Sequence, residues 1–341
     1  MEFKTKTAVV ILNWNGIYFL EKFLEGVLNS LSGHDAMLIV ADNASTDNSV
    51  EYIKSNYPDI GLILFDQNYG FTGGYNRALQ QVDAEYYILL NSDVEVPANW
   101  LAPLVEYMDA NPGTAACAPK LLAYHDKTLF EYAGAAGGFI DKYGYPFCRG
   151  RILQNIEKDN GQYNTNIDVF WATGAALMIR ADLYHKAGGL DDSFFAHMEE
   201  IDLCWRLHLM GYKVANVPQS YVYHVGGGAL PKESPRKLYL NYRNNLMMLA
   251  KNLQKGAFFT ILMRLFLDGI SALIYLFTGK FSSFIAVIKA HWTFFIRIPQ
   301  CRKSKKQFKP LIKQKASIGM YKGSIVYRFF KSGKKLKFSD L

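Results

Sequence analysis

The chain has 341 residues, of which 50% are hydrophobic and 15% aromatic; this composition excludes a disordered protein and suffices for one large domain or two ordinary ones. The net charge of +8 is uneven, because residues 297–341 carry fourteen lysine or arginine residues against one acid, a net +13, which leaves −5 for residues 1–296. Positive charge confined to one end argues against a nucleic-acid-binding protein, in which basic residues spread over the folded binding face.

The first third of the chain alternates strand-like and helix-like stretches. Apolar, β-branched runs predict buried strands at 7–14, 36–43, 60–66 and 86–93, and helix-like stretches separate them at 17–32, 49–57 and 73–82. This order predicts an α/β fold, with an open, mostly parallel sheet flanked by helices on both faces.

Polar residues stand where the predicted strands end. They are Asn13, Asp42, Asn43, Asn68, Asn91 and Asp93. In such sheets ligands bind at the carboxyl ends of the strands. One polar ending is ordinary turn chemistry, but four in succession predict a binding site at this edge.

The second of these endings has two interpretations that hold together. Asp42 and Asn43 present a carboxylate and an amide suited to a base edge or a ribose hydroxyl. Ser45 or Asp47, in the same segment, is suited to cap the following helix.

A glycine-rich loop precedes the third predicted helix. Because they lack Cβ atoms, Gly70, Gly73 and Gly74 let backbone N–H groups approach a ligand, and a helix N-terminus favours a diphosphate. A tight turn explains the same glycines about as well, since their spacing matches neither GxGxxG nor a P-loop.

Asp93, at the end of a hydrophobic strand, is suited to hold Mg²⁺ or Mn²⁺, hard cations that prefer oxygen ligands and bridge phosphates. Aspartate is also common in turns. His224 closes another strand-like run. It is a second metal ligand only if the fold brings it to Asp93, and is otherwise a hydrogen-bonded structural histidine.

Three carboxylates, of Glu199, Glu200 and Asp202, lie within four residues. A helix that begins near Met198 would pair Asp202 with Arg206 at the i,i+4 spacing and place acids in its first turn, where they complement the helix dipole. Its apolar stripe would consist of Ile201, Trp205 and Leu209. Aromatic residues just before the acids indicate a helix start in a pocket.

A set of motifs in this order and spacing resembles the family 2 glycosyltransferases of bacterial polysaccharide assembly, particularly the rhamnosyltransferase-like members. The motifs are VVILNWNG, ADNASTDNS, NYGFTGGYNRAL, LLNSDVEV, WATGAALMIR, GGLDDSFFAHMEEIDLCWRLHLMGYKV, YVYH and KLYLNYRNN. The resemblance covers roughly residues 1–255. As a set the motifs are specific, although each alone is not.

The resemblance implies a GT-A fold, an inverting mechanism, a nucleotide-diphosphate sugar donor and a divalent cation, Mg²⁺ or Mn²⁺. Asp93 corresponds to the family's metal-binding aspartate, with His224 as its partner, but Asn91 and Ser92 stand where the family often has a second acid or a proline. The expected substrate-binding residues are Asn13, Asp42, Asn43, Asn68, Gly70, Gly74, Asn76, Ser92, Trp171, Thr173 and Gly174.

The family's general base is usually the second acid of an acidic pair. Here that pair is Glu199 and Glu200, so the resemblance makes Glu200 the expected base and places Glu199 beside it in the catalytic set. Asp202 is the alternative, although its pairing with Arg206 makes it a poorer proton acceptor.

The last third poses a different physical problem. Residues 258–277 have the length of a membrane span, but Arg264 and Asp268 fall on one polar face, and each ionised residue costs about 2.5 to 3.5 kcal/mol in the bilayer core. We therefore expect an amphipathic helix in the membrane interface, a second one at 282–298, and a basic tail attracted to anionic lipids. The alternative is that these helices pack on the catalytic domain or on a second copy in a homodimer.

These observations predict a GT-A catalytic domain at 1–240, an amphipathic helical membrane-associating region at 241–300 and a basic C-terminal tail at 301–341. The apolar run at the N-terminus meets Asn13 too soon for a signal peptide, and four scattered cysteines suit reduced thiols. We expect a cytoplasmic enzyme on the inner face of the membrane, with a lipid-linked or glycan acceptor and no nucleic acid.

Two other functions compete with this interpretation. A sugar nucleotidyltransferase would also use an α/β sheet and a metal, but it would need a basic, glycine-rich loop near the N-terminus, where this chain has LNWNGIYF. A non-catalytic, membrane-bound glycan-binding subunit would not need to keep Asp42, Asp93 and the acidic pair together.

Overall fold

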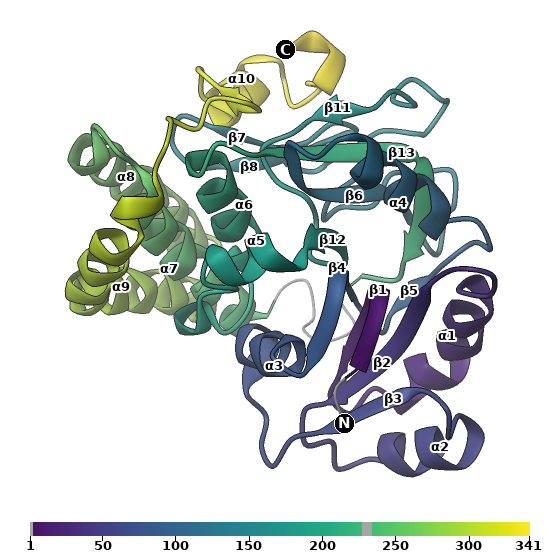
Figure 1. Ribbon diagram of the computed structural model, residues 1–341. Coiled ribbons are helices and arrows are strands. Elements are labelled where there is room, and N and C mark those ends of the chain that lie inside the picture. Colours follow the sequence, from purple (N-terminus) through teal and green to yellow (C-terminus); the bar gives the residue numbers. More distant parts are fainter. Residues whose placement is uncertain (1–2, 227–233) are drawn as a thin grey trace.

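The protein is represented by a computed structural model that describes residues 3–226 and 234–341. Its first third alternates strand and helix as the sequence predicts (Figure 1). The elements are β1 (Phe3–Asn13), α1 (Ile17–Ser30), β2 (Ala36–Asp42), α2 (Ser49–Asn56), β3 (Gly61–Leu64), α3 (Gly70–Leu79) and β4 (Val82–Leu90).

The central sheet places its strands in the order β11-β13-β6-β12-β4-β1-β2-β3, with β5 paired to β13. Strands β3, β2, β1 and β4 are parallel, as is the pair β6 and β13, whereas β12 runs antiparallel between β4 and β6. The further elements are β5 (Val94–Glu95), α4 (Leu101–Ala110), β6 (Thr114–Ala123), β11 (Ile167–Asp168), β12 (Ala176–Arg180) and β13 (Lys213–His224). The expected mostly parallel α/β sheet is therefore confirmed.

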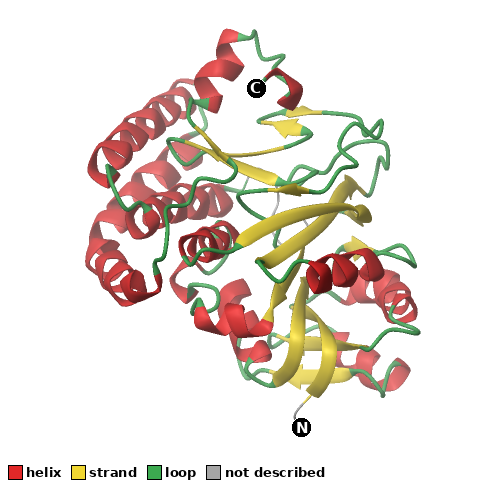
Figure 2. Ribbon diagram, turned by 45° about the horizontal axis from the view of Figure 1, so that its top comes forward, coloured by secondary structure: helices red, strands yellow, loops and turns green. Residues whose placement is uncertain are grey.

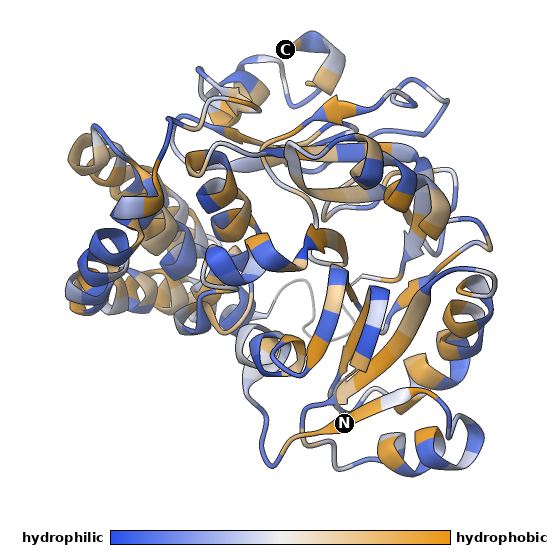
Figure 3. Ribbon diagram, viewed as in Figure 1, coloured by the Kyte–Doolittle hydropathy of each residue, from blue (hydrophilic) through white to orange (hydrophobic). Residues whose placement is uncertain are grey.

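The sheet is apolar on both faces because helices cover both (Figure 2). Neighbouring residues in β1 and β2, such as Val9 and Val10 or Ile39 and Val40, point to opposite faces and are all fully buried. Figure 3 colours β2 and most of β4 as hydrophobic. The parallel register sets Asn13 opposite Asp42, so the polar endings of these strands meet at one edge.

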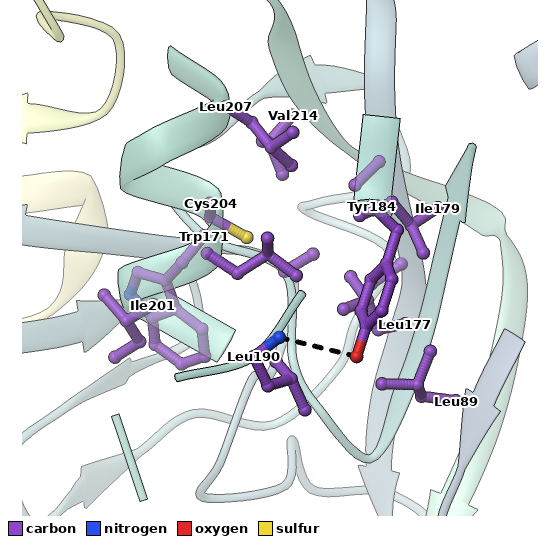
Figure 4. Close-up of a cluster of buried hydrophobic side chains, with 14 of the residues drawn as sticks. Leu89, Trp171, Leu177, Ile179, Tyr184, Leu190, Ile201, Cys204, Leu207 and Val214 are labelled. Carbon is purple, nitrogen blue, oxygen red and sulfur yellow. Dashed lines mark hydrogen bonds between the residues drawn. The ribbon is translucent and has the colours of Figure 1, made fainter. Parts of the chain in front are cut away.

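After β12 the chain forms α5 (Ala181–Lys186), the short 3₁₀ helix η1 (Asp192–Phe194) and α6 (Glu199–Leu209). Helix α6 begins where the sequence predicts, but it does not have one apolar stripe, since every residue from Ile201 to Leu209 is buried. Figure 4 shows Leu207 of α6 beside Val214 of β13, and Ile201 beside Trp171. The other side of α6 contacts α7 (Pro235–Asn252).

A second, smaller sheet lies beside the first, in the order β10-β9-β8-β7-β14. Its strands are β7 (Gly138–Asp141), β8 (Pro146–Cys148), β9 (Arg151–Ile152), β10 (Asn155–Ile156) and β14 (Met320–Tyr321). Helix α10 (Ile325–Lys331) buries Ile325 and Phe329 in a small core with Phe147 of β8. Part of the expected basic tail is thus folded onto the catalytic region, because its apolar residues complete this core.

Helices α8 (Ala257–Phe277) and α9 (Phe281–Phe308) pack against α7 at one side of the molecule, away from β3 (Figure 1). The 3₁₀ helices η2 (Lys309–Leu311) and η3 (Phe338–Asp340) complete the C-terminal part. Helix α7 begins before the expected boundary at 241 and α9 continues past the one at 300. The polar face of α8 points inward, since Arg264 and Asp268 are buried and form an ion pair of 2.7 Å.

Candidate active site

The ends of β1 and β2 form the first part of the candidate site. Asn13 donates from Nδ2 to Asp42 Oδ2 at 2.9 Å and to Ser45 Oγ at 3.1 Å, and the Ser45 N–H donates to Asp42 Oδ1 at 2.8 Å. Asn13 and Asp42 are both buried. Asn13, which lies opposite Asp42 on the adjacent strand, therefore fixes the orientation of the Asp42 carboxylate. A fixed carboxylate at the carboxyl edge of the sheet suits a binding role.

The loop before α3 is built around the amide of Asn43. Its Nδ2 donates to Asn68 Oδ1 at 3.0 Å and to the Gly70 carbonyl at 3.1 Å, while its Oδ1 accepts from the Tyr69 N–H at 2.9 Å. A Cβ atom at Gly74 would lie 2.7 Å from a methyl carbon of Leu12. These predicted residues thus come together, and their present partners are protein groups that fix the shape of the loop.

Two other predicted substrate-binding residues hold the segment that leads to α6. The side chain of Asn76 accepts from Tyr184 Oη at 2.6 Å and from the Leu190 N–H at 3.0 Å, and it donates to Asp192 Oδ1 at 2.6 Å. A Cβ atom at Gly70, where φ is +72°, would lie 2.6 Å from the ring of Phe195. Helix α3 and the segment before α6 are therefore closely joined.

The sheet brings Asp93 and His224 together, as a shared metal site requires. Strand β13 pairs with β5 so that His224 lies opposite Val94. His224 Nε2 lies 3.2 Å from Asp93 Oδ1, and His224 Nδ1 lies 3.6 Å from Glu131 Oε2. Glu131, in the loop after β6, is a residue that the sequence analysis missed, because no motif or spacing distinguishes it there.

The three groups shift one another's protonation. Burial alone would lower the pKa of His224, but hydrogen bonds and charge from Asp93 and Glu131 raise it to about 10. Burial alone would raise the pKa of Glu131, but the hydrogen bond and charge of His224 hold it below its ordinary value. In this state His224 is protonated, and its Nε2 atom faces the Asp93 carboxylate.

The donor set fits a divalent cation. A carboxylate oxygen and an imidazole nitrogen face each other, and Mn²⁺ accepts both ligand types. A carboxylate behind the other imidazole nitrogen, here that of Glu131, is the usual second partner of a metal-bound histidine. Within residues 3–226 and 234–341 no group of three or more histidine, cysteine, aspartate or glutamate side chains is arranged around one metal position, so substrate oxygens would have to complete the coordination.

The segment before β12 lies between the metal pair and the acidic helix. Thr173 Oγ1 donates to the Ala133 carbonyl at 2.7 Å and accepts from the Ala175 N–H at 3.2 Å. A Cβ atom at Gly174 would lie 3.6 Å from Cβ of Glu200. Trp171, by contrast, is buried and donates from Nε1 to the Phe139 carbonyl at 2.9 Å, toward the second sheet.

Ser92 stands at the same edge as Asn13. A Cβ atom built on Gly16 would lie 3.6 Å from Ser92 Oγ and would also contact Asn13 Oδ1. Ser92 therefore lies close to Asn13, which in turn contacts Asp42.

Glu199 and Glu200 occupy the first turn of α6. Burial raises the pKa of Glu200 to about 7, and burial together with the charges of Glu200 and Asp202 raises the pKa of Glu199 well above its ordinary value. The buried Oε2 atoms of both side chains have no hydrogen-bond partner in the described part of the chain. A carboxylate of this kind is suited to accept a proton near neutral pH.

Asp202 has a different environment. It is fully buried, accepts from Arg206 Nε at 2.9 Å and from Asn252 Nδ2 at 2.7 Å, and forms an ion pair with Lys251 at 3.0 Å. Lys251 also pairs with Asp191. With both oxygens engaged by α6 and α7, Asp202 serves to join these helices, and its position favours Glu200 as the proton acceptor.

A continuous series of contacts links the metal pair to the acidic helix. The series runs through Asp93, His224, Glu131, Ala133, Thr173, Gly174 and Glu200. The metal pair and the candidate base therefore lie at the same edge of the sheet. Two surface hollows of about 670 and 1070 Å³ lie elsewhere, one at the amino end of β4 and the other between α8 and α10.

The fold and this edge define the class of protein as a GT-A glycosyltransferase. The mannosyltransferase PcManGT from Pyrobaculum calidifontis, solved in complex with GDP-Man and Mn²⁺, has a similar fold, with a TM-score of 0.53, 15% identity, and 86% of this chain and 88% of that one covered.

The chain belongs to glycosyl transferase family 2, whose model matches residues 8–187. It is 24% identical to the N-acetylglucosaminyl-diphospho-decaprenol L-rhamnosyltransferase of Mycobacterium tuberculosis over 258 residues, which cover 71% of this chain and 83% of that one. It is also 24% identical to the rhamnosyltransferase WbbL of Escherichia coli, over 60% of this chain and 79% of the relative. The family predicted from the motifs is confirmed, which argues against the alternative of a sugar nucleotidyltransferase.

Proposed function

We propose that the protein transfers a hexose, rhamnose or a similar sugar, from a nucleotide-diphosphate donor to a hydroxyl group of a lipid-linked glycan, with inversion at the anomeric carbon. Relatives named as rhamnosyltransferases, one of which has a diphospho-decaprenol acceptor in its name, support this choice of donor and acceptor. The product would be part of a cell-surface polysaccharide.

Glu200 is the proton acceptor of this reaction. As the acceptor oxygen bonds to the anomeric carbon, the bond from that carbon to the diphosphate breaks, the nucleoside diphosphate leaves, and Glu200 takes the hydroxyl proton. The pKa of about 7 at Glu200 lets the side chain be ionised near neutral pH and yet remain basic enough to accept that proton. A base so placed contributes about 10²- to 10⁴-fold in rate.

The remaining residues hold the donor. Asp42 and Asn13 are placed to bind the base or ribose, and the loop around Asn43, Asn68 and Gly70 lies where the nucleotide would pass. Asp93 and His224 would hold Mg²⁺ or Mn²⁺, which neutralises charge on the diphosphate when it is bound. GDP-Man and Mn²⁺ in the complex of PcManGT support this assignment.

The observation that supports the proposal is the contact series from Asp93 to Glu200, because it joins the proposed metal pair to the proposed base at one edge of one sheet. The test is titration calorimetry of dTDP-, UDP- and GDP-sugars with and without Mn²⁺, followed by NMR of the product anomer. We expect one nucleotide to bind with Mn²⁺ dependence and the product to have the inverted configuration. No binding by any of these donors would overturn the proposal.

We also propose that the enzyme works on the inner face of a membrane. Helices α8 and α9 are long and apolar enough to cross one, and most of their apolar windows are not buried in the protein. The side chains of Phe259, Phe277 and Trp292 are exposed by 74, 83 and 69% of their surface. Soluble monomeric proteins rarely expose so many large apolar side chains together. Because Arg264 and Asp268 point into the protein, the helices turn their apolar side outward, which suits an interfacial position.

A further inference from the structure

The segment that joins η1 to α6 has a strained backbone. The φ angle is +67° at Phe195, +69° at His197 and +71° at Met198, and none of these residues is glycine. A non-glycine residue in such a conformation costs on the order of 1–3 kcal/mol and persists only where its surroundings over-determine it. We call residues 195–198 the strained segment.

Helix α7 provides one side of those surroundings, through Asn244. Its Nδ2 lies 3.1 Å from the Phe194 carbonyl oxygen, 2.8 Å from that of Ala196 and 2.8 Å from that of His197. The side chain is fully buried. The two N–H groups of this amide thus contact three carbonyl oxygens. All three contacts form only if the backbone of the strained segment keeps its present conformation.

Arg243 fixes the amide in turn. Its Nε donates to Asn244 Oδ1 at 2.8 Å, and its Nη2 donates to the Phe194 carbonyl at 2.9 Å and to the Ser193 carbonyl at 3.2 Å. The guanidinium therefore fixes which way the amide of Asn244 is oriented. It also binds the carbonyl of Ser193, one residue before those that Asn244 contacts.

Helix α3 holds the opposite side of the segment. The N–H groups of Phe71 and Thr72 donate to the Phe195 carbonyl at 3.0 and 3.3 Å. The ring of Phe195 also fills the space beside Gly70. Every carbonyl group from Ser193 to His197 consequently has a donor from α3 or α7.

The strained segment leads directly into the candidate base. Met198 precedes the first residue of α6, and no side-chain hydrogen bond caps this helix. Since the Oε2 atoms of Glu199 and Glu200 lack partners within the described residues, the backbone must do most to set the direction of these carboxyl groups.

We infer that Asn244, oriented by Arg243, is a positioning residue for catalysis: it holds the strained segment in the conformation that aims Glu200 at the acceptor hydroxyl. The inference rests on the proposed function, because Glu200 must be the base. It also gives the motif at 237–245 a role that its sequence alone does not reveal.

The test compares Asn244→Ala with Asn241→Ala in the full chain. Asn241 lies one turn earlier on α7 and donates to the Lys237 carbonyl of its own helix. With the donor and acceptor found active for the wild type, we expect Asn244→Ala to lower kcat about 10- to 100-fold, with less than about a 3-fold change in donor KM. The acidic limb of its pH profile should move to lower pH, because a Glu200 released from its buried position becomes hydrated. Asn241→Ala should match the wild type.

Hydrogen exchange supplies a readout that needs no turnover. Asn244→Ala should speed exchange in peptides that span 193–203 and leave the β1 and β2 peptides unchanged. If Asn244→Ala does not fold, Arg243→Lys takes its place, since it removes the bond to Asn244 while keeping the charge.

Three outcomes are decisive. Unchanged kcat and pH profile per folded molecule, with only a lower Tm, would overturn the inference. Unchanged exchange at 193–203 would overturn it as well. If the wild type transfers no sugar, the proposed function fails, and the exchange experiment alone then decides whether Asn244 holds the segment.

Discussion

At the scale of single residues, the site depends on carboxyl groups kept in unusual environments. Asp42 is fully hydrogen-bonded, Asp202 is paired with two cations, and Glu200 is partly exposed with an oxygen that lacks a partner among the described residues. Burial raises the pKa of Glu200 and so disfavours its charged form. The three acids therefore differ by their surroundings and not by their residue type.

The first prediction concerns how much the buried Glu200 lowers the stability of the fold as the pH rises. Its pKa is about 7 in the folded protein and 4.5 ordinarily, so the folded state binds more protons than the unfolded state between these values, and stability falls as pH rises through this window. Above pH 7 the cost is up to about 3 kcal/mol. Glu200→Gln cannot ionise, so its Tm should exceed that of the wild type at pH 8, with the difference shrinking toward pH 5. A difference that does not vary with pH would contradict the assigned environment.

The second prediction concerns Glu131. Because this carboxylate lies behind His224, Glu131→Gln should weaken Mn²⁺ binding about 10- to 100-fold, the usual cost of losing such a partner. Titration with Mn²⁺, followed by electron paramagnetic resonance of the free ion, measures the affinity directly. Glu95→Gln, on the neighbouring strand, is the control and should bind Mn²⁺ as the wild type does.

The residues of the strand endings were predictable, and Glu131 was not. Asn13, Asp42, Asn43 and Asp93 follow from one rule, that parallel strands bring their carboxyl ends to one edge. Glu131 reaches His224 only through a loop whose path no periodicity encodes. The pairing of Asp93 with His224, which lie far apart in the sequence, was conditional on the fold and rested on the family resemblance.

At the scale of elements, the buried ion pairs between α6 and α7 hold the catalytic helix in place. Lys251 pairs with both Asp202 and Asp191, and its charge, against the opposing effect of burial, lowers the pKa of Asp191 to about 2. Sequence alone predicted the contact of Asp202 with Arg206, because it is local. It did not predict Lys251, which comes from a helix some fifty residues later.

Lys251→Met should destabilise the protein by about 3 to 5 kcal/mol at pH 7, because it removes the ion pair of Asp191 and one of the two cations that pair with the buried Asp202. Urea unfolding measures this loss. Lys255→Met, at an exposed position just after α7, should change stability by less than about 0.5 kcal/mol. Equal effects of the two substitutions would show that the ion pairs do not join the helices.

The order of elements in the first third was the most predictable part of the fold. The apolar, β-branched runs of β1, β2 and β4 are buried on both faces, so sequence and burial agree there. Helix α6 was harder, since a helix buried on all sides has no periodicity to detect. The small sheet with β14 could not be predicted, because its strands are short and lie far apart in the chain.

In the whole molecule, α8 and α9, which pack against α7, form an apolar surface at one side. The sequence predicted two amphipathic helices but not that the polar residues Arg264 and Asp268 of α8 would be the buried ones. Arg264, which argues against a membrane span, pairs with Asp268 of the same helix and donates to Asn245 of α7 at 2.6 Å. Deleting the C-terminal region would remove β14 and α10 from the second sheet, so point substitutions are the sharper test of membrane binding.

Phe259→Glu combined with Trp292→Glu should abolish flotation with vesicles that contain phosphatidylglycerol, because two charges would enter the interface. Tyr18→Glu, on an exposed position of α1, is the matched control and should float as the wild type does. Wild-type binding by the double variant would end the membrane proposal. A dimer in vesicle-free sedimentation that the double variant dissociates would assign the surface to a second copy instead.

The proposed role of Glu200 as the proton acceptor, in a site shared with the donor, can be tested with two glutamine variants. The wild type, Glu200→Gln and Glu51→Gln, an exposed control on α2, are compared for donor affinity and for single-turnover sugar transfer. We expect equal donor affinity for all three, and a transfer rate that falls by about 10²- to 10⁴-fold for Glu200→Gln alone. Transfer by Glu200→Gln at the wild-type rate would contradict this role.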